Sequence, residues 1–177
     1  MRMAPALVRP KVSDTPGRIV VGVGDVVVTD DPDTLIITHA LGSCIGVTVY
    51  DPVARVSGML HFMLPSSKTN PQKAEMNPAM FGDSGIPLLF RSVYELGAKK
   101  DRMIVCAAGG AEVIDDDGHF KVGSRNRTFL RKIFWKNDVL LEADDTGGTI
   151  SRTLSLHTTD GRITVSSRGK ERSLWPE

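Results

Sequence analysis

The stretch that decides the fold runs from Thr38 to Pro65 and reads T-H-A-L-G-S-C-I-G-V-T-V-Y-D-P-V-A-R-V-S-G-M-L-H-F-M-L-P. Two apolar runs flank a turn at Asp51-Pro52, which predicts a hairpin of two antiparallel strands. Side chains alternate between the two faces of a strand, and the apolar ones of the second run fall mainly on its even positions. His61 is therefore predicted on the opposite face, where its ring can meet solvent or a substrate.

The same alternation places Cys44 opposite the apolar side of the first strand, near the end of the hairpin that His61 reaches. A cysteine attacks as its thiolate, and a neighbouring imidazole is the usual means of forming one near neutral pH. Backbone N–H groups at the preceding Gly42-Ser43 bend could stabilise an oxyanion. Two plainer interpretations stay open at this point, a buried structural cysteine and a structural histidine.

Outside this hairpin the pattern predicts more strands and two main helices. The first helix carries helical apolar spacing from Ile86 and stops near Gly97, and the second runs to about Asn137 with Ser124 or Asn126 as its cap. The segment 66–78 reads as a loop, either a lip of the site or a plain surface loop. The other expected strands are one or two within 18–29, then 34–38, 103–108, 139–142, 149–156 and 162–166.

Composition describes an ordinary globular protein of 177 residues, with 41% hydrophobic and 24% charged residues, which suits one domain. The net charge of +1 makes no electrostatic case for nucleic acid or a membrane surface. No apolar run approaches the roughly 20 residues that span a bilayer, so we expect a cytoplasmic protein with no membrane insertion. We expect a flexible N-terminal tail over 1–17, a domain over 18–167 and a C-terminal tail over 168–177.

Several smaller features receive structural interpretations. Cys106 lies in an apolar run and is expected in the core, and two cysteines make no disulfide framework. Gly109-Gly110-Ala111 lacks the spacing of a nucleotide loop, so close backbone packing is the favoured explanation. The acidic residues of 115–118 are expected at a solvated hairpin tip rather than at a cation site.

Together, T-x-x-L-G-S-C-I-G-V-x-x-Y-D and G-M-L-H-F-M-L-P closely resemble the CheD family of chemoreceptor glutamine deamidases. The chain also carries G-G-A at 109–111, G-S-R-N at 123–126, G-G at 147–148 and D-G-R at 160–162, in the family's order. The resemblance implies an α+β fold, a three-layer α/β/β sandwich of mixed and antiparallel sheets with two main helices. It also implies a cysteine nucleophile, Cys44, with His61 as base and Thr38 to orient the imidazole, and no metal or cofactor.

By the same resemblance, the substrate is the set of cytoplasmic methylation helices of chemoreceptors. A CheC-type phosphatase is a further possible partner, and the free protein is expected to be a monomer. Two other functions stay open, a non-catalytic adaptor for receptor or phosphatase and a different thiol enzyme such as a transglutaminase or peptidase. The chain departs from the family pattern at three places: His39, Ser66-Ser67 and 81–83. His39 lies between Thr38 and Cys44, where it could either perturb Cys44 or face solvent.

Overall fold

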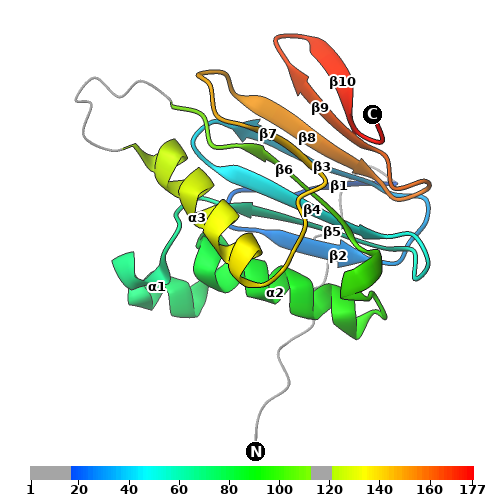
Figure 1. Cartoon of the computed structure of the whole chain (residues 1–177), viewed down its shortest axis with the longest axis horizontal. Coiled ribbons are helices and arrows are strands. Elements are labelled where there is room, and N and C mark those ends of the chain that lie inside the picture. The colour runs from blue at the N-terminus through cyan, green and yellow to red at the C-terminus, as the bar shows by residue number, and fades with distance from the viewer. Residues whose placement is uncertain (1–16, 113–120) are drawn as a thin grey trace, which may run out of the picture.

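The structure, a computed structural model, describes residues 17–112 and 121–177 and contains two five-stranded sheets (Figure 1). The outer sheet has the order β1-β3-β8-β9-β10, and the central sheet has the order β2-β5-β4-β6-β7. The strands of the outer sheet are β1 Arg18–Val20, β3 Leu35–Leu41, β8 Arg152–His157, β9 Ile163–Ser167 and β10 Lys170–Trp175. Those of the central sheet are β2 Val26–Thr29, β5 Val56–Phe62, β4 Ile45–Asp51, β6 Ile104–Gly109 and β7 Ala143–Thr146.

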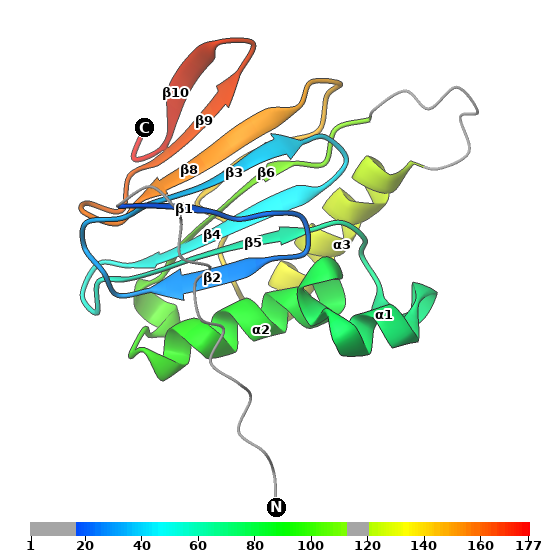
Figure 2. The ribbon, with the colours of Figure 1, turned by 180° about the vertical axis from the view of Figure 1, so that it is seen from behind.

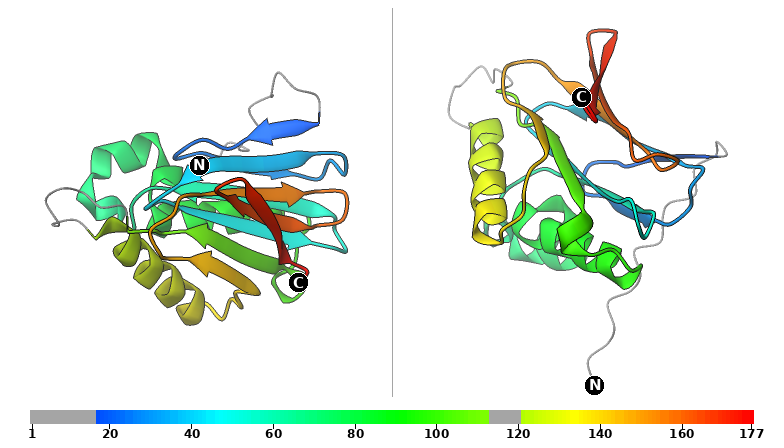
Figure 3. Two further views of the ribbon diagram at one scale, coloured as in Figure 1. Left: turned by 90° about the horizontal axis from the view of Figure 1, so that it is seen from above. Right: turned by 45° about the vertical axis from the view of Figure 1, so that its right-hand side comes forward.

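Two long helices, α2 Gly82–Glu95 and α3 Val122–Lys136, lie on the face of the central sheet that the outer sheet leaves uncovered, so the layers are helix, sheet and sheet (Figure 3). A shorter helix, α1 Pro71–Met76, buries none of its residues and packs against the 3-10 turns on either side of it. The strand pairs are antiparallel except β1 with β3 and β6 with β7, which confirms the predicted α+β sandwich. Across 17–112 and 121–177, no helix is long and apolar enough to cross a membrane.

Two apolar cores fill this sandwich, and the central sheet contributes to both. Val47, Leu60 and Phe62 belong to the core against the helices, whereas Met59 and Leu154 belong to the core between the sheets. Every residue of β4 and β5 is therefore buried. The alternation predicted from sequence is correct, but the expected open face is wrong, because the outer sheet covers it.

The β4–β5 hairpin forms as predicted, with Ile45 opposite Phe62 and Asp51 opposite Val56. The helix α2 begins one turn before the apolar spacing that predicted it. Its first turn lacks a side-chain cap, but the Gly82 N–H donates to Leu64 O at 2.8 Å. Because that acceptor comes from the segment after β5, the start of the helix depends on a contact between distant residues.

The second long helix also begins earlier than expected, at Val122, and neither Ser124 nor Asn126 caps it. Asn126 instead lies within the helix and is completely buried. The segment 66–78 was expected to lack regular structure, but it holds the 3-10 turn η1 Ser67–Thr69 and the helix α1, followed by η2 Pro78–Met80. Asp83 accepts hydrogen bonds from the Ser67 N–H and hydroxyl, which ties this segment to α2.

Two expectations about the last third of the chain are wrong. The predicted strand over 139–142 is displaced to β7, because parallel pairing places Cys106 opposite Ala143. The expected C-terminal tail over 168–177 contains β10, which pairs with β9 and buries Leu174. Two further expectations concern segments that the structure does not describe. The expected hairpin tip over 115–118 lies outside the described residues, and so does the expected tail over 1–17 except for residue 17.

Candidate active site

Figure 2 shows the chain crossing from the outer sheet to the central sheet between β3 and β4. The sequence-predicted residues come from this crossing and from the strands beside it. Thr38 lies in β3 of the outer sheet, and His61 lies in β5 of the central sheet. Cys44 ends the short bend that joins β3 to β4. The site thus takes one side chain from each sheet and one from the connection between them.

Thr38 and His61 are in direct contact. The Thr38 hydroxyl lies 2.7 Å from His61 Nδ1 and donates to Val21 O, also at 2.7 Å. A hydroxyl has one proton to donate and can still accept. Since that proton is engaged by Val21 O, the hydroxyl accepts from Nδ1–H, and the neutral ring keeps its free lone pair on Nε2.

His61 is almost completely buried, at 1% exposure. Burial lowers its pKa to about 4, although the nearby Asp25 carboxylate acts in the opposite direction. The ring is therefore neutral at pH 7. Nε2 is buried too, and none of the described residues forms a hydrogen bond with it. This nitrogen is chemically a base with no partner of its own.

Cys44 packs against the core between the two sheets, on the side of the central sheet where His61 lies. Gly46 is directly opposite His61, and Cys44 comes two residues before Gly46, just before the first paired residue of β4. The absence of a side chain on Gly46 leaves room for the outer sheet, since a Cβ there would lie 2.9 Å from Leu154 Cδ2 and 3.0 Å from Leu41 Cδ1. Cys44 is partly exposed, and burial raises the pKa of its thiol. The structure contains no hydrogen bond between Cys44 and His61.

The bend before Cys44 is held through its backbone carbonyls. Gly42 O accepts from Ala111 N and Cys44 O accepts from Gly110 N, each at 2.8 Å, which confirms close packing as the role of Gly109-Gly110-Ala111. The Gly42 N–H donates to Ala40 O at 2.9 Å. The N–H groups of this bend that donate to no carbonyl of the described residues are those of Ser43 and Cys44.

Asn126 binds the carbonyl of Ser43, which lies between the two N–H groups of Ser43 and Cys44. This contact was not predicted from the sequence. The Asn126 side-chain amide donates to Ser43 O and to Met63 O, each at 2.9 Å. The sequence signal was present: Asn126 lies one helical turn before Leu130 and two before Phe134, on the buried stripe of α3. An asparagine at a core position of a helix needs hydrogen-bond partners inside the protein, because buried polar groups are nearly always hydrogen-bonded.

His39 lies at the surface and Cys106 lies in the core. His39 points to the exterior, within 3.4 Å of Arg18 and of Thr153, so of the two alternatives it faces solvent. Cys106 is fully buried, as expected, and burial raises its pKa to about 12. Within the described part of the chain, no group of three or more His, Cys, Asp or Glu side chains could hold a metal ion.

Comparison with known proteins gives a consistent result. The family described as CheD chemotactic sensory transduction matches residues 63–167. The protein of Syntrophus aciditrophicus (strain SB) named "Probable chemoreceptor glutamine deamidase CheD 1" is 46% identical over 153 residues, covering 86% of this chain and 96% of that protein. "Probable chemoreceptor glutamine deamidase CheD" of Solibacter usitatus (strain Ellin6076) is 46% identical over 159 residues, covering 90% and 94%.

A more distant relative comes from an archaeon. "Probable chemoreceptor glutamine deamidase CheD" of Pyrococcus horikoshii (strain ATCC 700860 / DSM 12428 / JCM 9974 / NBRC 100139 / OT-3) is 37% identical over 145 residues, covering 81% of this chain and 88% of that protein. A match that covers 86% of this chain must include the whole stretch 38–61. The similarity therefore extends across the candidate site as well as the rest of the fold.

Proposed function

The chain belongs to the CheD family, and from this membership we infer that it is a chemoreceptor glutamine deamidase, an amide hydrolase. Its substrates are glutamine side chains of chemoreceptors, which it converts to glutamate with release of ammonia. We propose that Cys44 is the nucleophile, His61 the general base and acid, and Thr38 the residue that orients His61.

In the first half of the reaction, the Cys44 thiol attacks the glutamine side-chain carbon as its proton passes to His61 Nε2. The carbon–sulfur bond forms, and the carbonyl electrons move onto oxygen. The N–H groups of Ser43 and Cys44 stabilise that oxyanion. When the intermediate collapses, the carbon–nitrogen bond breaks, and the nitrogen leaves as ammonia with the proton from Nε2.

In the second half, water attacks the resulting thioester and gives a proton to Nε2. Collapse of this intermediate breaks the carbon–sulfur bond and returns the proton from Nε2 to the Cys44 sulfur. The glutamic acid side chain that forms then releases its own proton to solvent and becomes glutamate. His61 thus serves as base and acid in each half. Thr38 keeps the proton on Nδ1 throughout, which leaves Nε2 as the nitrogen that exchanges protons.

The observation that carries this proposal is the chain of contacts from Val21 O through the Thr38 hydroxyl to His61 Nδ1. It selects the tautomer whose free lone pair is on Nε2, as a base beside a thiol requires. A histidine that served only to fill the core would be satisfied at both nitrogens. Here Nε2 has no hydrogen-bond partner among the described residues.

The test is peptide-mass analysis of a chemoreceptor cytoplasmic fragment incubated with the protein. Conversion of specific glutamines to glutamates is expected with wild type and with Cys106→Ala, a matched control that removes the buried thiol. Cys44→Ala and His61→Ala should abolish it. Thr38→Val should lower kcat about 100-fold or more, and Thr38→Ser should restore much of it because the hydroxyl returns. Full activity in Cys44→Ala would refute the assignment.

The receptor helices are cytoplasmic, so we propose that the reaction occurs in the cytoplasm, by a protein that is monomeric when free. Light scattering tests the monomer. A CheC-type phosphatase is the proposed second partner, tested by co-purification. Binding of either partner without any glutamine conversion would favour the adaptor alternative, and incorporation of a labelled amine would favour a transglutaminase.

A further inference from the structure

We propose that Asn126 is a positioning residue that sets the separation between Cys44 and His61, an inference that rests on the proposed pairing of these two side chains. Asn126 lies in α3, on the helix side of the central sheet, and is completely buried. Its amide group contacts the chain on both sides of the site: at Ser43, directly before Cys44, and at Met63, two residues after His61.

The hydrogen bonds fix the orientation of this amide. Both acceptors are backbone carbonyls at 2.9 Å, and only the nitrogen end of an amide side chain can donate to a carbonyl. The two protons of Nδ2 are thereby both used. Oδ1 is left buried, with no donor among the described residues, at a cost of about 1 to 3 kcal/mol. The Asn126 amide is thus oriented entirely by the carbonyls of Ser43 and Met63.

We call the two hydrogen bonds from Asn126 to Ser43 O and Met63 O the Asn126 clamp. Its position lets it fix the geometry of the Cys44–His61 pair. His61 is held in the β4–β5 ladder opposite Gly46, whereas Cys44 comes one residue before Ile45, the first paired residue of β4. The backbone position of Cys44 therefore depends on the bend, where Ser43 O is held by the Asn126 side chain. Without these two hydrogen bonds the bend keeps its contacts with Gly110 and Ala111 but loses its link to Met63, the link that ties the thiol to the strand of His61. A shift of about 1 Å can reduce a reaction rate 100-fold.

The experiment measures alkylation of Cys44 by iodoacetamide, followed by intact mass, which requires no receptor. Asn126→Asp keeps the size of the side chain but replaces both donors with an acceptor. The control Thr158→Val removes another buried polar clamp, whose hydroxyl accepts from Thr34 N and donates to Thr34 O at 2.8 Å, far from Cys44 in the chain. Cys106→Ala serves as the background, so that a single thiol reacts.

At pH 7 we expect His61→Ala to slow alkylation at least 10-fold and Asn126→Asp to slow it comparably, with the double variant no slower than His61→Ala. Thr158→Val should react like wild type. Asn126→Asp reacting like Thr158→Val, in samples equally folded by circular dichroism, would overturn the inference while leaving the Cys44–His61 pair intact. Equal rates in wild type and His61→Ala would instead refute the pair, and the positioning role with it.

Discussion

At the scale of the residue, burial decides the protonation state of Cys44 and His61, the proposed catalytic pair. A cysteine beside a histidine suggests a preformed thiolate and imidazolium. Here burial lowers the pKa of His61 to about 4 and raises the pKa of the Cys44 thiol. Both shifts favour the uncharged forms, because a partly buried ion pair loses hydration. The resting site therefore holds a thiol and a neutral imidazole, and charge develops only as the proton moves during attack.

This state predicts a specific titration of His61. Nitrogen NMR of histidine-labelled protein should show His61 as the Nδ1–H tautomer at pH 7, with a pKa of about 4. Asp25→Asn should lower that pKa further, because the carboxylate favours the charged ring. Deamidation should accordingly stay nearly constant from pH 8 to about 5, since the base remains neutral. An acid limb near the ordinary histidine pKa of 6.5, or a proton found on Nε2, would contradict the tautomer assignment.

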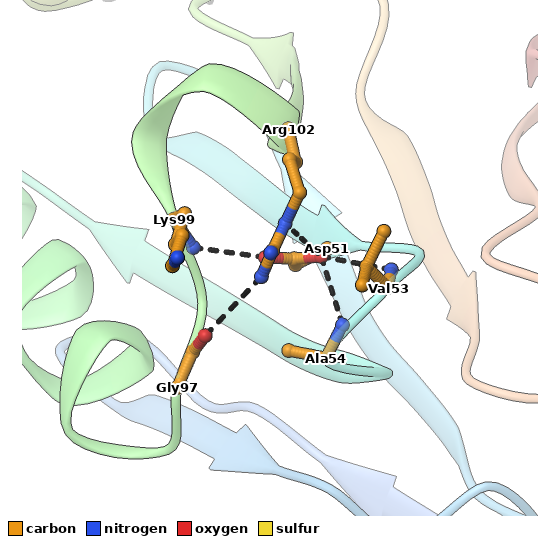
Figure 4. Close-up of polar contacts among 6 residues, drawn as sticks. All are labelled: Asp51, Val53, Ala54, Gly97, Lys99 and Arg102. Atoms are coloured by element: carbon orange, nitrogen blue, oxygen red, sulfur yellow. Dashed lines mark hydrogen bonds and ion pairs between the residues drawn. The ribbon is translucent and has the colours of Figure 1, made fainter.

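At the scale of the element, Asp51 fastens the far end of the β4–β5 hairpin (Figure 4). Its carboxylate accepts from the Val53 and Ala54 N–H groups in the turn and from Lys99 N. Arg102 adds an ion pair at 2.6 Å. Burial disfavours the charge, but these hydrogen bonds outweigh it and hold the pKa of Asp51 at about 2.

Asp51→Asn should lower the free energy of unfolding by about 3 kcal/mol, because it leaves Arg102 and backbone donors without their charged acceptor. Since the pKa in the folded state lies below the ordinary 3.8, the contribution of Asp51 is complete above that pH. It disappears as the pH falls toward about 2. Urea unfolding at pH 7 and pH 3 measures both effects, with exposed Asp101→Asn as control. An equal loss in the two variants would contradict this role for Asp51.

The bend before Cys44, the proposed nucleophile, also depends on β6. Gly109 has a φ of +108°, and a Cβ there would lie 2.2 Å from Cys44 O, whereas Gly97 has a φ of +96° with nothing within 4 Å. Gly97→Ala thus imposes a comparable backbone strain without the clash. Gly109→Ala should displace Cys44 and reduce kcat about 100-fold, while Gly97→Ala costs only about 1 kcal/mol of stability. Equal deamidation rates in both variants would show that the bend accommodates the extra methyl group.

At the scale of the whole molecule, motifs that are far apart in the sequence meet around one bend. The 109–111 segment binds the carbonyls of Gly42 and Cys44. Asn126 of the 123–126 motif binds the carbonyl between them. Gly147 N donates to Gly109 O at 2.9 Å and Glu112 N donates to Gly148 O at 2.8 Å, which adds the 147–148 pair. The scaffold thus supports the bend before Cys44, the proposed nucleophile, from β6, α3 and the β7–β8 connection.

The C-terminal strand predicts a whole-molecule effect of truncation. Deleting residues 170–177 removes β10, leaves β9 as an unpaired edge and exposes the apolar surface that Leu174 covers. The free energy of unfolding should fall by about 2 to 5 kcal/mol, and aggregation should increase at the new edge. Thermal unfolding and light scattering measure these changes, with deletion of 176–177 alone as the control. Equal stability of the two deletions would support the original expectation of a tail.

The sequence by itself determined the local features of this protein. Alternation predicted the β4–β5 hairpin and put Cys44 and His61 on one face, and helical spacing predicted both long helices. Ordered motifs indicated the family and, with it, Thr38. These inferences succeed because side-chain periodicity and turn residues depend on neighbouring positions in the chain.

Only the tertiary structure decided the rest. The outer sheet covers the face that seemed open, and its burial of His61 sets a neutral base. β7 and β10 are strands because β6 and β9 offer them backbone hydrogen bonds, not because their side chains favour strand. Asn126 became a clamp through two carbonyls distant in sequence. Burial and long-range hydrogen bonds belong to pairs of segments, so no pattern within one segment predicts them.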